Sequence, residues 1–431
     1  MLGAFVNAFR TPDLRRKLLF VLGIIVVFRL GSQVPAPGVN VPNVQQCFAQ
    51  VENSGLYGLI NLFSGGALLQ LTVFALGIMP YITASIILQL LVVVIPRLET
   101  LKKEGQAGQT KITQYTRYLT LALAILQATG IVALARAGQL LQGCTLDLLY
   151  NNSIGTVLVM VITMTAGTGI IMWLGELITD RGIGNGMSIL IFTQVVATFP
   201  SSLWALKETR GWAVFVMVVV IGLAIMAMVI FMEQGQRRIP VQYARRMVGR
   251  KMYGGSSTYI PLKVNQAGII PVIFASSLLY LPALGTQFDP DASNPVSAFV
   301  ARYLVSGSHP LYMALFFAMI VFFTYFYVAI TFNPQEVADN MKKYGGFIPG
   351  IRAGRPTEEY LNYVLSRITL PGATYLGLIA LIPLIALALV GANQNFPFGG
   401  TSILIMVGVA LDTVKQIESQ LQQRNYEGFL R

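Results

Sequence analysis

Long apolar runs alternate with short polar segments along almost the whole chain. Ten runs approach the roughly 20 residues that a helix needs to cross a bilayer core, and each is bounded by a charge, a glycine or a proline. The runs are 18–34, 73–95, 118–137, 154–174, 187–198, 212–231, 267–281, 311–332, 373–389 and 402–414. This pattern predicts an all-α, polytopic membrane protein with ten transmembrane helices.

Composition supports the same fold class. Hydrophobic residues make up 55% of the 431 positions, charged residues only 11%, and the mean hydropathy is +0.65. Soluble domains carry roughly 25% charged residues, and a globule this poor in charge would expose large apolar patches. The composition therefore excludes a soluble protein and a disordered chain.

The positions of Lys and Arg predict the orientation of the chain, because cations favour the cytoplasmic side of a membrane. With the N-terminus inside, few of the 30 cations fall near or on the outer side, namely Arg29, Arg136, Lys207, Arg210 and Arg302. Both termini are therefore expected in the cytoplasm. Ten helices then divide into two halves, 1–200 and 201–431, and five helices per half give the second half an inverted orientation.

One apolar segment is too short to cross the membrane. Residues 56–63 lie on the outer side, between Gly55 and the pair Gly65-Gly66, and lead into the second run. Irregular backbone at membrane depth is tolerated only against protein or a water-filled cavity. The pattern fits a short re-entrant helix in an outer vestibule and, equally, an amphipathic helix on the surface.

The sequence carries no recognisable catalytic or metal-binding signature. It has one histidine, His309, and lacks both a GxSxG motif and the GxxxxGK[ST] spacing of a phosphate loop. Four carboxylates, those of Glu176, Asp180, Glu233 and Asp412, fall near predicted helix ends, whereas proton-coupled carriers need acids deep in the bilayer. We therefore expect no enzyme and no cofactor, and a passive conduit or a structural membrane protein instead.

Both cysteines of the chain, Cys47 and Cys144, lie in predicted outer loops. A disulfide would be stable in an oxidising space. Two free thiols fit the sequence as well, since sequence does not fix the distance between the two residues.

The second apolar run contains a pair of isoleucines on one helix face. Ile78 and Ile82 are four residues apart, and Pro80 between them is expected to disturb the backbone hydrogen bonds of the helix. On spacing alone, these isoleucines fit an ordinary core or lipid-facing role as well as a special one.

Two cytoplasmic segments carry unusual chemistry. Residues 236–246 hold more arginines than membrane orientation requires, which fits attraction to anionic lipid or a docking surface for an acidic partner such as ribosomal RNA or a soluble motor. In residues 345–352, glycines and Pro349 shape a turn that presents Arg352. The shaped turn favours docking over a simple charged loop.

Several strings, in order along essentially the whole chain, resemble the SecY family of protein-translocation channels in its bacterial form. They are NLFSGG at 61–66, LGIMPYI at 76–82, WLGE at 173–176, RGIGNG at 181–186, the charged segment 236–246, FIPGIR at 347–352 and GGT at 399–401.

The resemblance implies the main subunit of a channel that passes unfolded secretory chains across the bacterial plasma membrane and releases hydrophobic segments sideways into lipid. Two five-helix halves would form a clamshell around an hourglass pore. An apolar ring at its waist would block ions by dewetting and still deform around a passing chain. The ring would consist of Ile78, Ile82, Met187, Ile191, Ile273 and Ile405.

One ring position departs from the family. It commonly has isoleucine where this chain has Met187, and methionine is flexible and apolar enough to close a gasket. The resemblance also identifies residues 55–66 as a plug for the outer funnel. The residues expected to form it are Leu56, Tyr57, Leu59, Ile60, Asn61, Leu62 and Phe63.

The resemblance further implies a lateral gate between the second and third spans and the seventh and eighth. Polar Thr83, Gln127 and Asn265 match its positions and would close the seam with modest hydrogen bonds. A simple interhelical hydrogen bond without a gating role fits each of them equally well. A sufficiently apolar signal helix would shift the gate towards its open state.

The implied partners are the SecE and SecG membrane subunits, the SecA motor, the ribosome, signal sequences with their preproteins, and the lipid bilayer. Docking of the motor or ribosome would use cytoplasmic loops 233–265 and 333–368, through Arg237, Arg238, Arg245, Arg246, Arg250 and Arg352. The family usually has proline after the last arginine, whereas Ala353 follows here and loosens the turn.

An inverted-repeat solute carrier is the alternative reading. It would need a substrate pocket and, usually, ions or acids buried at mid-bilayer, which the sequence does not indicate. A non-conducting scaffold is a second alternative, but it would not need the plug-like segment.

Overall fold

The chain is described here by a computed structural model that covers residues 9, 11–51, 67–68, 70–136, 138, 146–151, 153–243, 246–248, 251–253, 257–287, 295–304, 309–390 and 400–428. Each of the ten predicted apolar runs lies largely within a helix in these residues. The helices are α2 (Pro12–Gly31), α3 (Val41–Val51), α5 (Met79–Val94), α6 (Pro96–Lys103), α7 (Gln106–Arg136), α8 (Ile154–Arg181), α9 (Gly186–Gln234), α10 (Ile270–Gln287), α11 (Pro295–Tyr303), α12 (Pro310–Thr331), α13 (Pro334–Lys343), α14 (Arg355–Val390) and α15 (Gly400–Gly428).

Length and composition alone qualify several of these helices as membrane spans. In the described part of the chain, five stretches are long and apolar enough: Gln106–Arg136, Ile154–Arg181, Gly211–Gln234, Pro310–Lys343 and Arg355–Ile382. The pair α5 and α6 would make a sixth, but the two helices are bent by 100°. The apolar helices Gly186–Pro200 and Ile270–Leu279 are shorter. The remaining predicted runs, 18–34 and 402–414, correspond to α2 and α15.

Helix boundaries differ from the apolar runs where a helix continues into polar sequence. α7 begins at Gln106 and α14 at Arg355, well before the runs at 118 and 373, because a helix that leaves the bilayer keeps its backbone hydrogen bonds in water. α9 joins the runs 187–198 and 212–231 across a break at Gly211, whose φ of +82° is unfavourable for residues with a Cβ. Hydropathy detects only the apolar part of each helix.

The prediction that Pro80 disturbs a continuing helix is wrong. α5 begins at Met79, after a series of turns, so Pro80 lies in its first turn. A proline there interrupts no hydrogen bond, because the first N–H groups of a helix have no partner within it. The fixed φ of the proline instead favours the start of the helix.

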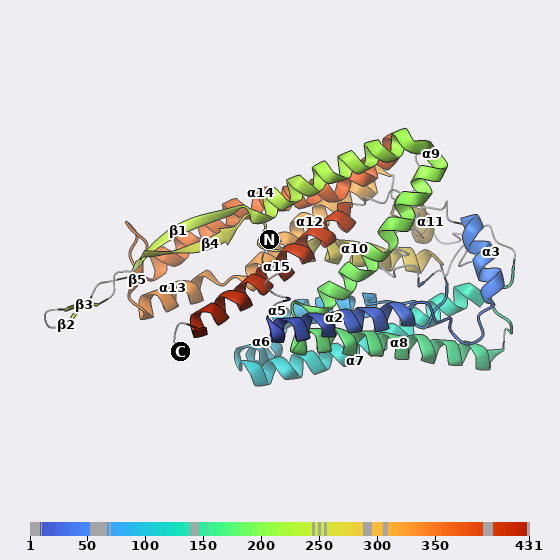
Figure 1. Cartoon of the computed structure of the whole chain (residues 1–431), viewed down its shortest axis with the longest axis horizontal. Coiled ribbons are helices and arrows are strands. Elements are labelled where there is room, and N and C mark those ends of the chain that lie inside the picture. The colour runs from blue at the N-terminus through green and yellow to red at the C-terminus, as the bar shows by residue number, and fades with distance from the viewer. Residues whose placement is uncertain are drawn as a thin grey trace.

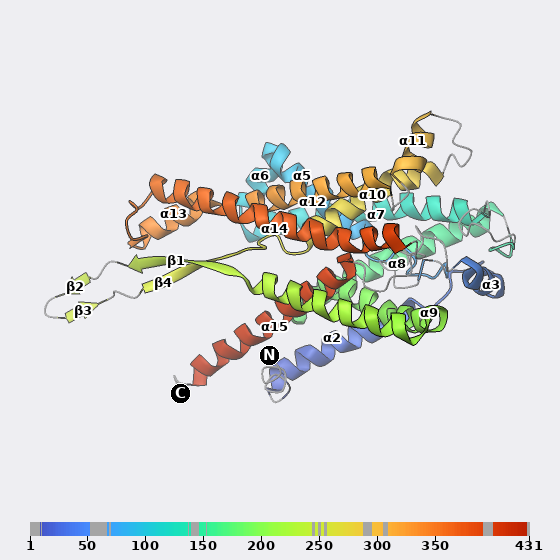
Figure 2. The same cartoon turned by 90° about the horizontal axis from the view of Figure 1, so that it is seen from above.

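Two groups of helices pack side by side along the molecule (Figure 1). In the first, α5 and α8 both pack on α7, and α2 packs on α8. In the second, α10, α12 and α14 pack together, and α15 packs on α14. α9 contacts both α8 and α15 and so links the groups, and α5 also touches α10. Seen from above, α9 lies beside the start of α15 (Figure 2).

A disulfide involves the short helix α3 at one end of the molecule. Cys47 on α3 is fully buried and disulfide-bonded. The only other cysteine of the chain, Cys144, lies outside the described residues. α3 is also tied to residues 147–150, since the N–H of Asn40 donates to the carbonyl of Leu148 at 2.9 Å. The question that the sequence left open is therefore settled in favour of a disulfide at Cys47.

A small antiparallel sheet lies at the opposite end (Figure 1). Its strands β1 (Gln236–Tyr243), β4 (Ser257–Lys263) and β5 (Gly346–Phe347) have the order β4-β1-β5, with Gln236 opposite Lys263 and Gln242 opposite Phe347. A separate hairpin joins β2 (Arg246–Val248) and β3 (Lys251–Tyr253). One face of the larger sheet packs on α13 and α14 in an apolar cluster that includes Ile239, Val241, Leu262, Met341, Ile348, Leu361 and Val364.

Candidate functional site: an apolar constriction and its surroundings

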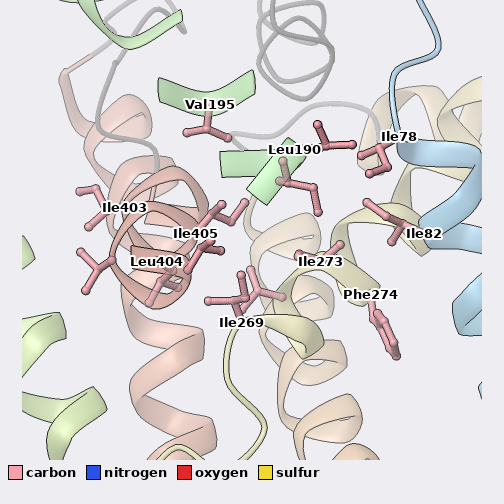
Figure 3. Close-up of a cluster of buried hydrophobic side chains, with 14 of the residues drawn as sticks. Ile78, Ile82, Leu190, Val195, Ile269, Ile273, Phe274, Ile403, Leu404 and Ile405 are labelled. Atoms are coloured by element: carbon pink, nitrogen blue, oxygen red, sulfur yellow. The ribbon is translucent and has the colours of Figure 1, made fainter. Parts of the chain in front are cut away.

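The six residues predicted to form the ring meet in one apolar cluster. They come from α5 and its N-cap, the first part of α9, α10 and α15, so both groups of helices contribute. Figure 3 shows Ile78 and Ile82 facing Ile273, with Ile405 across from them on α15. Their exposed fractions are 1% for Ile78, 8% for Ile82, 4% for Ile191, 6% for Ile273 and 2% for Ile405, and Met187 is partly buried against the cluster.

The start of α5 fixes the first two ring positions. Gly77 has a φ of +56°, which turns the chain into the helix. Ile78 is the N-cap of α5, and its carbonyl accepts the N–H of Ile82 at 3.1 Å. The two isoleucines therefore lie one helical turn apart on the same face, as their spacing predicts.

Close approach of α8 and α9 positions Met187. A Cβ on Gly186 would lie 1.9 Å from the carbonyl oxygen of Gly175, so only glycine permits this contact. The hydroxyl of Thr179 accepts the N–H of Gly186 at 2.9 Å. The side chain of Asn185 caps α9 by accepting the N–H of Met187 at 3.1 Å.

A cavity of about 380 Å³ opens beside the ring. Its apolar wall includes the ring residues Ile82, Met187, Ile191 and Ile273. Its other wall is polar and includes the side chains of Arg117, Glu176 and Asp180. The ring therefore borders open volume on the side where the charged ends of α7 and α8 lie.

The polar wall contains an ion pair that sequence reasoning did not find. The guanidinium of Arg117 donates from Nε and Nη2 to the two carboxylate oxygens of Glu176, at 2.9 and 2.8 Å, and from Nη1 to Gln114 at 3.0 Å. Two parallel hydrogen bonds give a well-defined geometry. Glu176 and Arg117 are far apart in sequence and were noted only as a helix-end acid and a loop cation. No local pattern links them.

The three predicted gate residues are all buried but do not bond to one another. Thr83 is 8% exposed, Gln127 7% and Asn265 3%. The hydroxyl of Thr83 donates to the carbonyl of Met79 in its own helix, at 3.0 Å. The amide of Asn265 donates to the carboxylate of Glu233 and, at 3.1 Å, to the carbonyl of Gly268. Their predicted role in a lateral gate stays a prediction.

The two cytoplasmic loops predicted to dock partners form one structural unit, because β1 pairs with both β4 and β5. Arg237 and Arg238 are exposed on β1, next to buried Ile239. Arg238 stacks on Tyr259 of β4, with its guanidinium carbon 4.9 Å from the ring centre. Arg246 belongs to β2, and Arg245 and Arg250 lie outside the described residues.

Arg352 is exposed in the turn between β5 and α14. Gly350 and Gly354 flank it with φ values of +85° and +109°, which only glycine adopts easily. The hydroxyl of Thr357 donates to the carbonyl of Arg352 at 2.8 Å and holds the turn closed. The structure thus presents this arginine in a shaped turn, as the sequence predicts, with Ala353 in place of a proline.

The predicted plug cannot be placed in this structure. Residues 52–66, which include Leu56, Tyr57, Leu59, Ile60, Asn61, Leu62 and Phe63, lie outside the described residues.

Comparisons with known proteins give one family. The SecY family model matches residues 72–414. The proteins named protein translocase subunit SecY from Streptomyces scabiei and Streptomyces coelicolor are each 68% identical over 438 residues, and the one from Mycobacterium tuberculosis is 63% identical over 441 residues; all of both chains is covered in each case.

Solved structures have the same fold at low identity. A protein-conducting channel matches with a TM-score of 0.64 and 18% identity, and Sec61 in a canine ribosome–channel complex with 0.63 and 18%. A SecY protein studied for its plug domain matches with 0.62 and 19%. Each match covers 94% of this chain and 91% of the other.

Proposed function

The chain belongs to the SecY family of protein translocase subunits, and we propose that its ring of six apolar side chains forms the waist of the protein-conducting pore. The chain passes unfolded secretory polypeptides across the membrane and releases hydrophobic segments sideways into lipid. It is a passive conduit, and a partner supplies the energy. Family membership disfavours the alternative of a solute carrier.

One observation carries this proposal: ring residues from both groups of helices lie in a single apolar cluster beside a cavity. A narrow apolar constriction dewets and so resists the passage of ions. It offers no hydrogen bonds or charges that would hold particular side chains of a passing polypeptide. A polar ring would stall transport at such side chains.

The proposed gate and plug follow from the family. The gate opens where α5 and α7 meet α10 and α12, with Thr83, Gln127 and Asn265 at the seam. Their burial supports a position between helices and not on a lipid face. Residues 55–66 form the plug, and the halves 1–200 and 201–431 move relative to each other.

The unit built from β1, β4, β5 and α13 is the proposed docking platform for SecA or the ribosome. Exposed Arg237, Arg238 and Arg352 on connected elements support it. Arg245, Arg246 and Arg250 extend the same platform. The likeness to a Sec61 channel solved in complex with a ribosome agrees with this use. SecE and SecG are the proposed membrane partners.

The proposed location is the bacterial plasma membrane, with both termini and the docking platform in the cytoplasm. The disulfide at Cys47 supports this orientation, because disulfides persist on the oxidising side of that membrane. α3, which carries Cys47, lies at the end of the molecule away from the platform (Figure 1).

Ion leakage through the resting channel tests the ring. In reconstituted bilayers, Ile82→Ser places a polar hydroxyl in the constriction and is expected to raise resting ion conductance. Ile162→Ser makes the same exchange at a side chain that is 58% exposed on α8, and is expected to leave conductance at the wild-type level. Equal conductance of the Ile82→Ser channel and the wild type would contradict the gasket.

A further inference from the structure

Two exposed tryptophans enclose a lysine where α9 breaks. The ammonium of Lys207 lies 4.0 Å from the ring centre of Trp204 and 4.3 Å from that of Trp212. Trp204 is 58% exposed and Trp212 65% exposed, so the described protein leaves much of both indoles uncovered. We call these three residues the Trp–Lys cage.

The cage is held in shape by local contacts. The break at Gly211, with its φ of +82°, folds residue 212 back towards residues 204 and 207. The indole N–H of Trp204 donates to the carboxylate of Glu208 at 2.8 Å. Trp212 meets Phe215 edge to face, at 5.8 Å between ring centres. Both indoles are therefore restrained before any partner arrives.

The charge of Lys207 has no carboxylate partner in the described part of the chain. Its only contacts there are with the two rings, and Glu208 is engaged by the indole of Trp204 instead. Cation–π contacts satisfy only part of the ammonium group, whose three N–H donors point in different directions. A free acceptor from outside the chain fits the remaining direction.

The location selects the partner. α9 breaks at the end of the molecule where α3 and α11 lie, away from the sheet (Figures 1 and 2). Lys207 is one of the few cations at this end, where membrane orientation disfavours positive charge. Tryptophan is enriched at the level of lipid headgroups because its ring is apolar with one polar edge.

We propose that the Trp–Lys cage binds the phosphate of an anionic phospholipid in the leaflet on the side of α3 and α11. The indoles lie among the headgroups and upper acyl chains, and Lys207 donates to the phosphate. The cage thereby anchors the corner of α9, the helix that carries Met187 and Ile191 at its start and contacts both groups of helices.

Quenching of tryptophan fluorescence by brominated phospholipids tests the depth of the cage. The chain has three tryptophans, so Trp173→Phe leaves only Trp204 and Trp212 as emitters. The full-length variant in vesicles is expected to be quenched most by lipid brominated near the headgroup and least by lipid brominated near the chain end. If Trp173→Phe does not fold, the difference between wild type and Trp204→Phe/Trp212→Phe isolates the same signal. Absence of quenching, or stronger quenching from the chain end, would overturn the proposal and indicate water, protein or bilayer core around the cage.

Lipid charge tests the role of the lysine. At equal low mole fraction, headgroup-brominated phosphatidylglycerol is expected to quench as if enriched about fivefold over brominated phosphatidylcholine, the effect of one lysine near an anionic headgroup. Lys207→Gln should abolish this preference. Lys103→Gln, at an exposed lysine on α6, should retain it. A preference that survives Lys207→Gln, or none in the unsubstituted protein, would refute phosphate binding.

Discussion

Arg117 and Glu176 join α7 to α8 through two hydrogen bonds of 2.9 and 2.8 Å in the wall of the cavity beside the ring. The Arg117 side chain is 41% exposed and that of Glu176 18% exposed, so solvent screens the pair only in part. The pair fixes the position of α8, whose end approaches the start of α9 and thus Met187.

Breaking this pair is expected to destabilise the helix bundle. Glu176→Gln leaves the arginine without its charge partner and should lower the free energy of unfolding by about 1–2 kcal/mol, between the values for exposed and buried pairs. Thermal unfolding in detergent measures the effect. Lys103→Gln, which removes the exposed pair with Glu99, is the control and should leave the melting temperature unchanged. Equal melting temperatures for both variants and the wild type would show that the Arg117–Glu176 pair does not stabilise the bundle.

Gly186→Ala is expected to disturb the ring without touching any ring side chain. The new Cβ would lie 1.9 Å from the carbonyl of Gly175, so α8 and α9 must separate, at a cost of about 1–3 kcal/mol. Met187 moves with the helix start, and resting ion conductance should rise. Gly23→Ala is the control, since a Cβ there meets nothing within 4 Å; it should be neutral or stabilising. Unchanged stability and conductance in Gly186→Ala would mean that the helix contact is not what positions Met187.

The ring shows how far sequence alone reaches. Spacing placed Ile78 and Ile82 on one helix face, which the hydrogen bond between them confirms. Nothing local indicated that Ile273 and Ile405 would join them, because that meeting depends on how two groups of helices pack; only the resemblance to a family suggested it.

Other features were beyond the sequence for different physical reasons. The ion pair of Arg117 and Glu176 is a long-range contact without a motif. The disulfide at Cys47 required a distance that spacing does not give. Pro80 was misjudged because a continuous apolar run concealed the turns before α5 and hence the true start of the helix.

The turn that presents Arg352 should matter for driven export. Arg352→Glu reverses a charge on an exposed side chain, so folding should be intact while export driven by the motor falls strongly. Arg355→Glu, three residues on and 86% exposed in its side chain, is the matched control and should impair export much less. Translocation of a preprotein into vesicles measures both. Equal effects of the two variants would point to bulk charge, and normal export by Arg352→Glu would remove the docking role.

The disulfide at Cys47 should stabilise the outer end of the molecule. Since the only other cysteine is Cys144, non-reducing peptide mapping is expected to join the two peptides that contain them. Cross-linking a loop of about 100 residues stabilises a protein by about 4–5 kcal/mol in the chain-entropy description. Reduction, or Cys47→Ser, should therefore lower the melting temperature. A reactive free thiol at Cys47 in protein isolated without reductant would contradict the structure.

Crosslinking of a stalled secretory chain tests the central claim, that six apolar side chains surround the translocating polypeptide. Single cysteines replace Ile82, Ile405 or the exposed Ile162, and a chain arrested in transit carries a thiol-reactive group along its length. We predict crosslinks at positions 82 and 405 from the same short stretch of the arrested chain, and none at 162. Crosslinks at 162 with none at 82 and 405 would show that the polypeptide passes elsewhere and that the apolar cluster is only a core.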